Sequence, residues 1–372
     1  MKVNLSRPDI TDLEINAVVE VLKSNQLSLG PKLVEFEQAF ADYSGCKYAV
    51  AVNSGTSGLF LCMQALGIGA GDEVITTPFT FIATVNCILQ VGATPVFVDI
   101  DPVSMNIDPA KIEEKITPRT KAIEPVYVFG NPWGVDEVCR IAKKHNLAVL
   151  EDSCEALGTE YKGKKAGTFG DAGLYAFYPN KQITTGEGAV IITDDTKIAD
   201  MCISLRNQGR GAGGGWLAHE RMGYNFRLPD INCALGTAQL SRLQEFKQLR
   251  SAAAATYLEL LADEKRLILP TIPDDCDMSW FVFVVRLIDG YTIEQRNLLL
   301  QKMLARGIQV SNYFPPVHLQ PFMVEQFGYK GGEFPITETT CNRTAALPFY
   351  NRISTDDIKL VCQNLRECLD EI

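Results

Sequence analysis

Short apolar runs alternate with amphipathic stretches through the first two thirds of the chain. The apolar runs predict strands at 48–52, 73–76, 94–98, 122–128, 148–150, 172–177 and 189–192. Apolar residues recur at helical spacing at 12–23, behind the cap candidate Thr11, and at 33–43, 57–66, 82–91, 135–145 and 196–205. Because strands that alternate with helices form βαβ units, the pattern predicts an α/β fold, in which helices flank a mostly parallel, seven-stranded sheet.

The pattern changes after a glycine-rich polar stretch at residues 209–215. A long helical pattern at 233–262, with one break, is followed by strands at 281–287 and near Val310 and by helices at 293–306 and 356–369. This mixture predicts a smaller α+β domain. A chain of 372 residues also exceeds the ~250–300 residues of a single core, so we expect a large domain at 1–245 and a small one at 246–372. The extreme N-terminus could pack on the small domain, and Trp216 could stack on a ligand or pack in the core.

Composition narrows the class of protein. With 46% hydrophobic and 22% charged residues, the chain is neither disordered, fibrous nor membrane-embedded. Its net charge of −10 argues against non-specific nucleic-acid binding but leaves room for an anionic small molecule. The 11 cysteines include no Cys-x-x-Cys pair and predict neither disulfides nor a metal site. The N-terminal segment is charged, and no long apolar run follows it, so we expect a soluble, cytoplasmic protein.

Residues 53–58 form a turn of glycines and hydroxyl residues between a predicted strand and a predicted helix. Such a turn offers free backbone N–H groups, hydroxyl donors and the positive end of the helix dipole, which suit a phosphate. A simple helix cap explains the same residues equally well.

Two further segments carry side chains that could do chemistry. Glu151 and Asp152 end an apolar strand, where an acid can bind magnesium or a ribose, pair with a protonated ring nitrogen, or cap the next turn. Lys181 stands between an aromatic strand and a Gly-Glu-Gly turn, so we expect its ammonium in a pocket, where lysine can form a Schiff base. An isolated lysine is more often a surface group.

Together, these three segments supply what pyridoxal 5′-phosphate requires. The turn would hold the phosphate, Lys181 would form the Schiff base, and Asp152 would keep the pyridine nitrogen protonated. An aromatic side chain should cover the ring, and Phe79 and Phe81 follow another predicted strand. In that order within one α/β domain, the segments favour a pyridoxal-phosphate enzyme.

The chain resembles the DegT/StrS-type sugar aminotransferases, which are pyridoxal-phosphate enzymes of aminotransferase fold type I. The resemblance covers nearly the whole sequence and, within the family, is greatest to 4-keto-6-deoxy sugar nucleotide aminotransferases such as perosamine synthases. The matching segments are 27–31, 54–56, 71–75, 92–95, 151–152, 169–171, Lys181, 186–188, 223–227 and 316–318.

The resemblance implies a role for each matching residue of the cofactor site. Lys181 would be the aldimine lysine, Asp152 the partner of the pyridine nitrogen, and Phe81 the residue stacked on the ring. The cofactor phosphate would be held by Gly55, Thr56 and Ser57.

Further residues are assigned by the same resemblance. Glu155 would face the phenolic oxygen of the ring, where relatives often have Gln or His. Asn225 would reach the phosphate of the partner subunit's cofactor, so the resemblance implies a homodimer with shared active sites. Arg227, Tyr313 and His318 match positions near the bound sugar nucleotide. No metal is implied.

Three departures from the family pattern stand out. Ala176 replaces a serine that commonly binds the phosphate, so one donor is lost. Glu155 brings a second carboxylate near the ring, from which we expect a shared proton or an altered aldimine pKa. Ala189 follows the Gly-Glu-Gly turn, where relatives often have another glycine, and we expect little effect.

The resemblance implies amino transfer from L-glutamate to a keto group, at C4 by analogy, of a nucleotide-linked keto-deoxy sugar in polysaccharide or O-antigen biosynthesis. A sugar 3-dehydratase on the same fold is the main alternative, but those enzymes carry His where this chain keeps Lys181. A non-catalytic regulatory protein that binds the cofactor is a second alternative. A dinucleotide-binding oxidoreductase is disfavoured, because the glycines at 209–215 do not follow a strand in the required spacing. Amination at C3 and a cyclitol substrate stay open.

Overall fold

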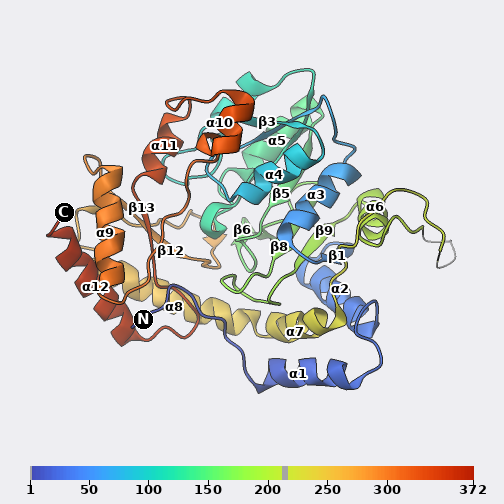
Figure 1. Ribbon diagram of the computed structural model, residues 1–372, viewed down its shortest axis with the longest axis horizontal. Helices are drawn as coiled ribbons and strands as arrows, with labels where there is room; N and C mark the ends of the chain where they lie inside the picture. The colour runs from blue at the N-terminus through green and yellow to red at the C-terminus, as the bar shows by residue number, and fades with distance from the viewer. Residues whose placement is uncertain (1, 212–216) are drawn as a thin grey trace.

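The computed structural model of the protein describes residues 2–211 and 217–372. Trp216 and part of the glycine-rich stretch lie outside the described residues. A central sheet occupies the middle of the molecule, with helices on both of its faces (Figure 1). Across these two ranges, no helix is long and apolar enough to span a membrane.

The central sheet has the strand order β1-β9-β8-β5-β4-β2-β3. The five strands from β8 to β3 pair in parallel, and β9 pairs antiparallel with both β1 and β8. The prediction of a mostly parallel, seven-stranded sheet is therefore confirmed. Its strands are β1 (Tyr48–Val52), β2 (Glu73–Thr76), β3 (Thr94–Phe97), β4 (Thr120–Ile123), β5 (Ala148–Asp152), β8 (Ala172–Ala176) and β9 (Ala189–Thr193).

The helices around this sheet are α1 (Asp12–Lys23), α2 (Pro31–Ser44), α3 (Gly55–Ala65), α4 (Ile82–Gln90), α5 (Val135–His145), α6 (Thr196–Arg206) and α7 (Asp230–Ser241). Successive strand residues face opposite sides of the sheet. Leu174 and Ile191 pack with α3, α4 and α6, whereas Tyr175 and Ile192 pack with α2 and α7. The two faces therefore bury separate apolar clusters, and the carboxyl ends of the parallel strands are left at one edge.

A further apolar cluster surrounds a second sheet, which has three strands in the order β10-β12-β13. Val3 belongs to this cluster and forms an isolated parallel bridge with Ile308, so the first residues of the chain pack within the region formed by its last third. The elements of this region are α8 (Leu243–Leu261), β10 (Leu267–Ile268), β12 (Phe283–Leu287), α9 (Ile293–Ala305), β13 (Thr344–Leu347) and α12 (Thr355–Leu369).

Smaller elements lie outside these two sheets. A third sheet has the order β11-β6-β7, and short helices follow several of the strands. Their bounds are η1 (Pro109–Lys111), η2 (Glu113–Lys115), η3 (Val128–Gly130), β6 (Glu160–Tyr161), β7 (Lys164–Lys165), β11 (Cys276–Asp277), η4 (Val317–Leu319), α10 (Pro321–Phe327) and α11 (Pro335–Cys341).

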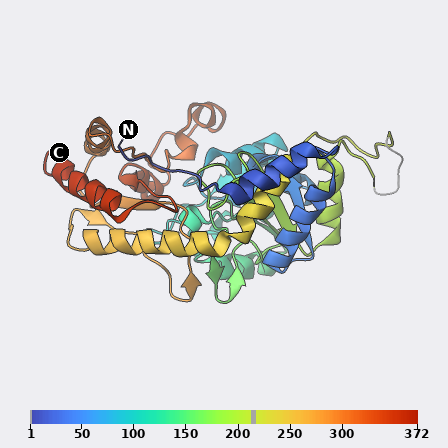
Figure 2. The same cartoon turned by 90° about the horizontal axis from the view of Figure 1, so that it is seen from below.

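The predicted helix at 233–262 is two helices, α7 and α8, which meet at Arg242 and run end to end along one side of the molecule (Figure 2). Since α8 starts at Leu243 and runs past residue 245, it connects the two regions, and the domain boundary stays a prediction.

Two strand predictions were wrong in detail. The strand predicted at 122–128 ends at Ile123, because Pro125 has no N–H to continue the ladder. The strand predicted near Val310 is absent from the described residues, where Ser311 makes only a single bridge to Ala346.

Candidate active site

The N-terminus of α3 contains the predicted phosphate turn. Ser54 caps the helix, and its Oγ accepts a hydrogen bond of 3.1 Å from the N–H of Ser57. In the first turn, the N–H groups of Gly55 and Thr56 have no partner within the helix and point out of its end. The turn therefore presents hydrogen-bond donors and the positive end of the helix dipole to one site.

Gly55 brings this turn against the ends of two strands. A Cβ atom placed on Gly55 would lie 3.3 Å from the Cβ of Ala176 and 3.4 Å from the Sγ of Cys154. Ala176 is the last residue of β8, and Cys154 follows β5 by two residues. The glycine thus allows the helix terminus to approach the strand ends closely, and the side chain of Ala176 faces the turn.

Asp152 ends β5 beside this turn and is 7% exposed. The hydroxyl of Thr84 donates to its Oδ2 at 2.7 Å, and the N–H of Cys154 donates to its Oδ1 at 3.3 Å. Donors on both oxygens fix the orientation of the carboxylate.

Its neighbour Glu151 points to the opposite face and has a structural role. Its carboxyl accepts hydrogen bonds from the Tyr127 hydroxyl and from the N–H groups of Gly167, Phe169 and Gly170. Burial raises the pKa of Glu151, although these donors oppose the shift. Of the two acids at this strand end, Glu151 anchors the loop that precedes β8, and Asp152 faces the phosphate turn.

Lys181 lies in the loop between β8 and β9, with 14% of its side chain exposed. Its Nζ is 3.4 Å from Oε1 of Glu155 and 4.1 Å from the centroid of the Phe281 ring. The ring face attracts the ammonium, as does the carboxylate. Two segments distant in sequence, one with Glu155 and one with Phe281, thus partly bury the Lys181 ammonium.

Glu155 is held in place by its other oxygen, which accepts a hydrogen bond of 2.9 Å from the N–H of Phe129. Burial raises the pKa of Glu155, and the opposing attraction of Lys181 does not cancel the rise. A buried carboxyl with a raised pKa within 3.4 Å of an amine is typical of a site for acid–base chemistry.

Tyr313 lies on the same side as Lys181. Its ring packs edge to face with Phe129 and Phe281, with centroids 6.0 Å and 6.4 Å apart. Burial raises the pKa of the Tyr313 hydroxyl to about 12, and the nearby Glu155 adds to the rise. The phenol therefore keeps its proton and can act as a hydrogen-bond donor.

The other predicted residues lie around the phosphate turn. The N–H of Asn53 donates to the carbonyl of Phe226, which joins the turn to the segment that carries Asn225 and Arg227. Asn225 is exposed, and Arg227 donates to Oδ1 of Asn207 at 3.0 Å. Within the described residues, neither Asn225 nor Arg227 contacts the Lys181 ammonium.

The two aromatic candidates differ in exposure. Phe79 is fully buried in an apolar cluster, whereas Phe81 is 61% exposed at the start of α4, one turn before Thr84. Because Thr84 holds Asp152, Phe81 flanks the site and Phe79 belongs to the core.

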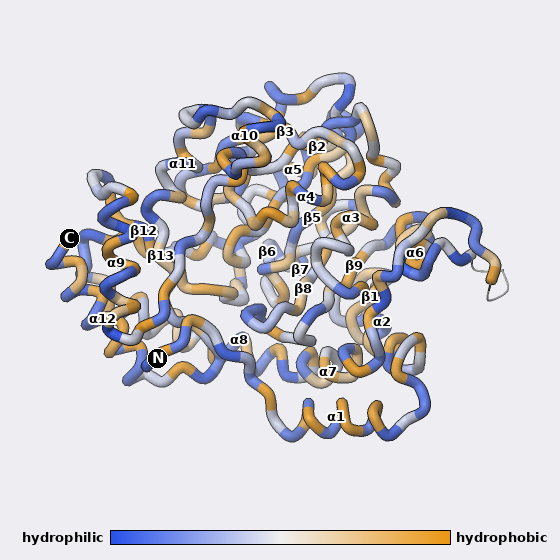
Figure 3. The backbone as a smooth tube through the Cα atoms, in the orientation of Figure 1, coloured by the Kyte–Doolittle hydropathy of each residue, from blue (hydrophilic) through white to orange (hydrophobic). Residues whose placement is uncertain are grey.

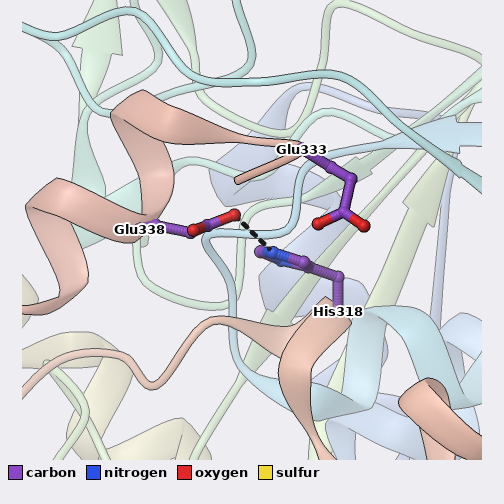
Figure 4. Close-up of side chains that lie close together, drawn as sticks. All are labelled: His318, Glu333 and Glu338. Carbon is purple, nitrogen blue, oxygen red and sulfur yellow. Dashed lines mark hydrogen bonds and ion pairs between the residues drawn. The ribbon is translucent and has the colours of Figure 1, made fainter. Parts of the chain in front are cut away.

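His318 is fully buried, away from the solvent, in a cluster with two glutamates (Figure 4). Its Nε2 is 3.0 Å from Oε1 of Glu338, and its ring packs on Phe334. Burial lowers the pKa of His318, while Glu338 opposes the shift. Glu338 also accepts from the N–H groups of Gly332 and Phe334, so the cluster holds the loop before α11. Glu333 completes this group.

Sequence reasoning missed two residues of the site. Thr84 follows Phe81 by one helical turn, so the predicted helix at 82–91 already placed it on the same face. Phe281 is 100 residues from Lys181 and was identified only as the start of a strand. No local pattern connects Phe281 to the lysine.

The sequence and the structure are both similar to those of known proteins. The sequence matches the DegT/DnrJ/EryC1/StrS aminotransferase family over residues 8–366. It is 40% identical to the spore coat polysaccharide biosynthesis protein SpsC of Bacillus subtilis, over 97% of this chain and 96% of that protein. It is 39% identical to GDP-perosamine synthase of Caulobacter vibrioides, over 86% of each protein. The solved PLP form of Spr1654 from Streptococcus pneumoniae has a TM-score of 0.93 to the structure at 27% identity, with 99% of both chains covered.

Proposed function

The chain belongs to the DegT/DnrJ/EryC1/StrS aminotransferase family, and from this premise we propose that it transfers an amino group from L-glutamate to C4 of a nucleotide-linked keto-deoxy sugar. It is a fold type I aminotransferase, and its cofactor is pyridoxal 5′-phosphate. The similarity to a spore coat polysaccharide protein and to GDP-perosamine synthase supports polysaccharide or O-antigen biosynthesis as the pathway class.

The observation that carries the proposal is the partly buried environment of Lys181. Its Nζ lies between Glu155 and the face of Phe281, within a site that also contains an oriented Asp152 and the open end of α3. These groups fit the cofactor: an amine to bond its aldehyde, a carboxylate for its ring nitrogen and N–H donors for its phosphate. When bound, pyridoxal phosphate supplies an electron sink for the carbon next to the transferred nitrogen.

The residues of the chain then have separate tasks. The Lys181 Nζ would take the proton from the substrate carbon and later return it, as general base and then general acid. Asp152, held by Thr84, would pair with the ring nitrogen, and Phe81 would cover the ring. Glu155 would face the phenolic oxygen. Gly55, Thr56 and Ser57 would hold the phosphate.

The substrate would be held by residues of the outer site. Arg227 offers a planar cation suited to a nucleotide diphosphate, and Tyr313 offers a protonated hydroxyl. His318 is fully buried and lies within hydrogen-bond distance of Glu338. We therefore propose that His318 fixes the conformation of the loop that faces the sugar.

A homodimer with shared active sites completes the proposal. Asn225 and Phe81 are exposed in the single chain, as expected for residues that a second copy covers. The outer helix α1 also carries apolar side chains that are about half exposed, those of Leu13, Ile15 and Leu22. Figure 3 shows the backbone of α1, with its hydrophobic positions in orange, at the lower edge of the molecule.

The decisive experiment incubates the purified enzyme with glutamate and a panel of keto-sugar nucleotides. We expect 2-oxoglutarate and an amino sugar; a deoxygenated sugar without 2-oxoglutarate would instead indicate a 3-dehydratase. Lys181→Ala should lose activity by about 10²–10⁴-fold or more, because the general base is removed. Lys162→Ala, on a surface lysine paired with Asp136, is the matched control and should keep full activity. Normal turnover by Lys181→Ala would refute the proposal.

Subunit sharing has its own test. Lys181→Ala and Asn225→Ala copies are each inactive if both residues are needed. After unfolding and refolding together, mixed dimers contain one site with both native residues, so about a quarter of the wild-type activity should return. No return of activity would place both residues in a site built by one chain.

A further inference from the structure

Arg250 is a buried cation without a buried anion. It lies in the middle of α8 and is 3% exposed. Burial lowers its pKa to about 10, with no carboxylate contributing, so it stays charged at neutral pH. Within the described chain, no carboxylate oxygen lies within 4.0 Å of its guanidinium. A buried charge is costly unless hydrogen bonds satisfy it, so its partners define its role.

Those partners are neutral oxygens, and two of them belong to the surroundings of the lysine. Nη2 donates to the carbonyl of Lys181 at 3.3 Å, and Nη1 donates to the carbonyl of Phe281 at 2.9 Å and to that of Trp280 at 3.3 Å. Nε donates to Oδ1 of Asn351 at 2.6 Å. One rigid guanidinium therefore joins the backbone of Lys181 to the backbone of the residue whose ring faces its Nζ.

A second link reinforces this geometry. The side-chain amide of Gln182 donates to the carbonyl of Glu155 at 2.6 Å and to that of Ser279 at 3.2 Å. Hydrogen bonds to Lys181 and Gln182 thus connect this part of the chain to the segments of Glu155 and Phe281, whose side chains contact the ammonium. The segment at 279–281 leads into β12, so these bonds fix the small-domain strand relative to the lysine.

We propose that Arg250 is a positioning residue for amino transfer: its guanidinium sets the distance and direction between Lys181 and Phe281, and so fixes where the Lys181 Nζ lies. Lysine cannot replace it, because an ammonium is a point donor without the planar fork that reaches several carbonyls. This inference rests on the proposed function of Lys181.

The chain contains a matched control in Arg296. Arg296 is also 3% exposed, its Nε donates to Oδ1 of Asn297 at 2.9 Å, and its Nη1 donates to the carbonyls of Cys341 and Thr344. The two arginines have the same type of neutral partners. Only Arg250 contacts the backbone of the lysine.

The experiment compares Arg250→Lys with Arg296→Lys in the holoenzyme. Urea unfolding measures the structural loss, steady-state kinetics give kcat and KM, and borohydride reduction followed by peptide mass spectrometry gives the fraction of cofactor bonded to Lys181. We expect similar losses of stability. Arg250→Lys should lower kcat by about 10–100-fold with KM changed by less than about threefold, since a small displacement of a reacting group costs about this much. The reduced cofactor on Lys181 should fall in this variant alone.

The milder pair Asn351→Ala and Asn297→Ala carries the same comparison if Arg250→Lys does not fold. Loss of the Nε acceptor should reduce kcat and trapping in Asn351→Ala and leave both unchanged in Asn297→Ala. Equal kcat and equal trapping within each pair would overturn the inference. The outcome stays distinct from failure of the proposed function, because in that case Lys181→Ala itself would keep its turnover.

Discussion

Replacement of Glu155 by glutamine tests whether the negative charge of this carboxyl raises or lowers the free energy of unfolding. The carboxylate and the Lys181 ammonium are 3.4 Å apart, and with an effective dielectric constant of about 20 their attraction is about 5 kcal/mol. Removal of both ions from water costs several kcal/mol for each. The pKa of Glu155 is raised by burial despite the attraction of Lys181, so the cost of burial is the larger of the two.

The sign of the pH dependence follows from this raised pKa. A carboxyl whose pKa is higher in the folded protein binds a proton more tightly there than in the unfolded chain. The folded state therefore loses stability as the pH rises from the unfolded pKa, near 4.5, through the raised folded value, by about 1.4 kcal/mol for each pH unit between the two. Glutamine carries no charge at any pH, so Glu155→Gln should lack this loss.

The assay is urea unfolding of the apoenzyme and of its Glu155→Gln variant between pH 5 and pH 8. We expect the variant to match the wild type within about 1 kcal/mol at pH 5 and to be relatively more stable at pH 8. Glu160→Gln, on a surface pair with Lys165, should show no such trend. If the ion pair dominated instead, the variant would be about 3–5 kcal/mol less stable at pH 8, and that result would refute the reasoning.

Three further predictions concern groups around the site. Ala176→Ser places a hydroxyl opposite the phosphate turn and should tighten cofactor binding by about 1 kcal/mol, roughly fivefold, in a fluorescence titration; an unchanged affinity would mean that the phosphate does not reach this position. Thr84→Val removes the donor to Asp152 and should lower kcat by about fivefold and the unfolding free energy by about 1–3 kcal/mol; a loss of stability with unchanged kcat would contradict this role. Although burial opposes ionisation, hydrogen bonds from neighbours that include Arg242 lower the pKa of Glu14 to about 2. Glu14→Gln should therefore cost about 2–3 kcal/mol of unfolding free energy above pH 4.5, and the difference should vanish as the pH falls toward 2; a constant difference would exclude the charge as its cause.

Local patterns were sufficient for the fold and for the segments that carry chemistry. The period of the apolar residues distinguished strands from helices through most of the large domain, because each element buries one or both of its faces. Asp152 and Lys181 could be found because a strand end and a glycine turn are visible in the sequence. The choice between Glu151 and Asp152 could not be made from position alone, since only the fold shows which carboxyl meets the N–H groups of Gly167 and Gly170.

A local sequence pattern identifies Lys181, but the residues that surround it come from distant parts of the chain. Glu155, Arg250 and Phe281 come from three segments that are distant along the chain, and each contacts Lys181 or its backbone. Arg250 lies on α8 and Phe281 lies just before β12, on the side of the molecule that holds the small-domain sheet. The position of that sheet and the position of the Lys181 Nζ are therefore coupled. Substitutions in this junction should alter kcat more than KM, because they would move the Lys181 Nζ, which we propose transfers the proton, and would leave the turn at the start of α3 in place.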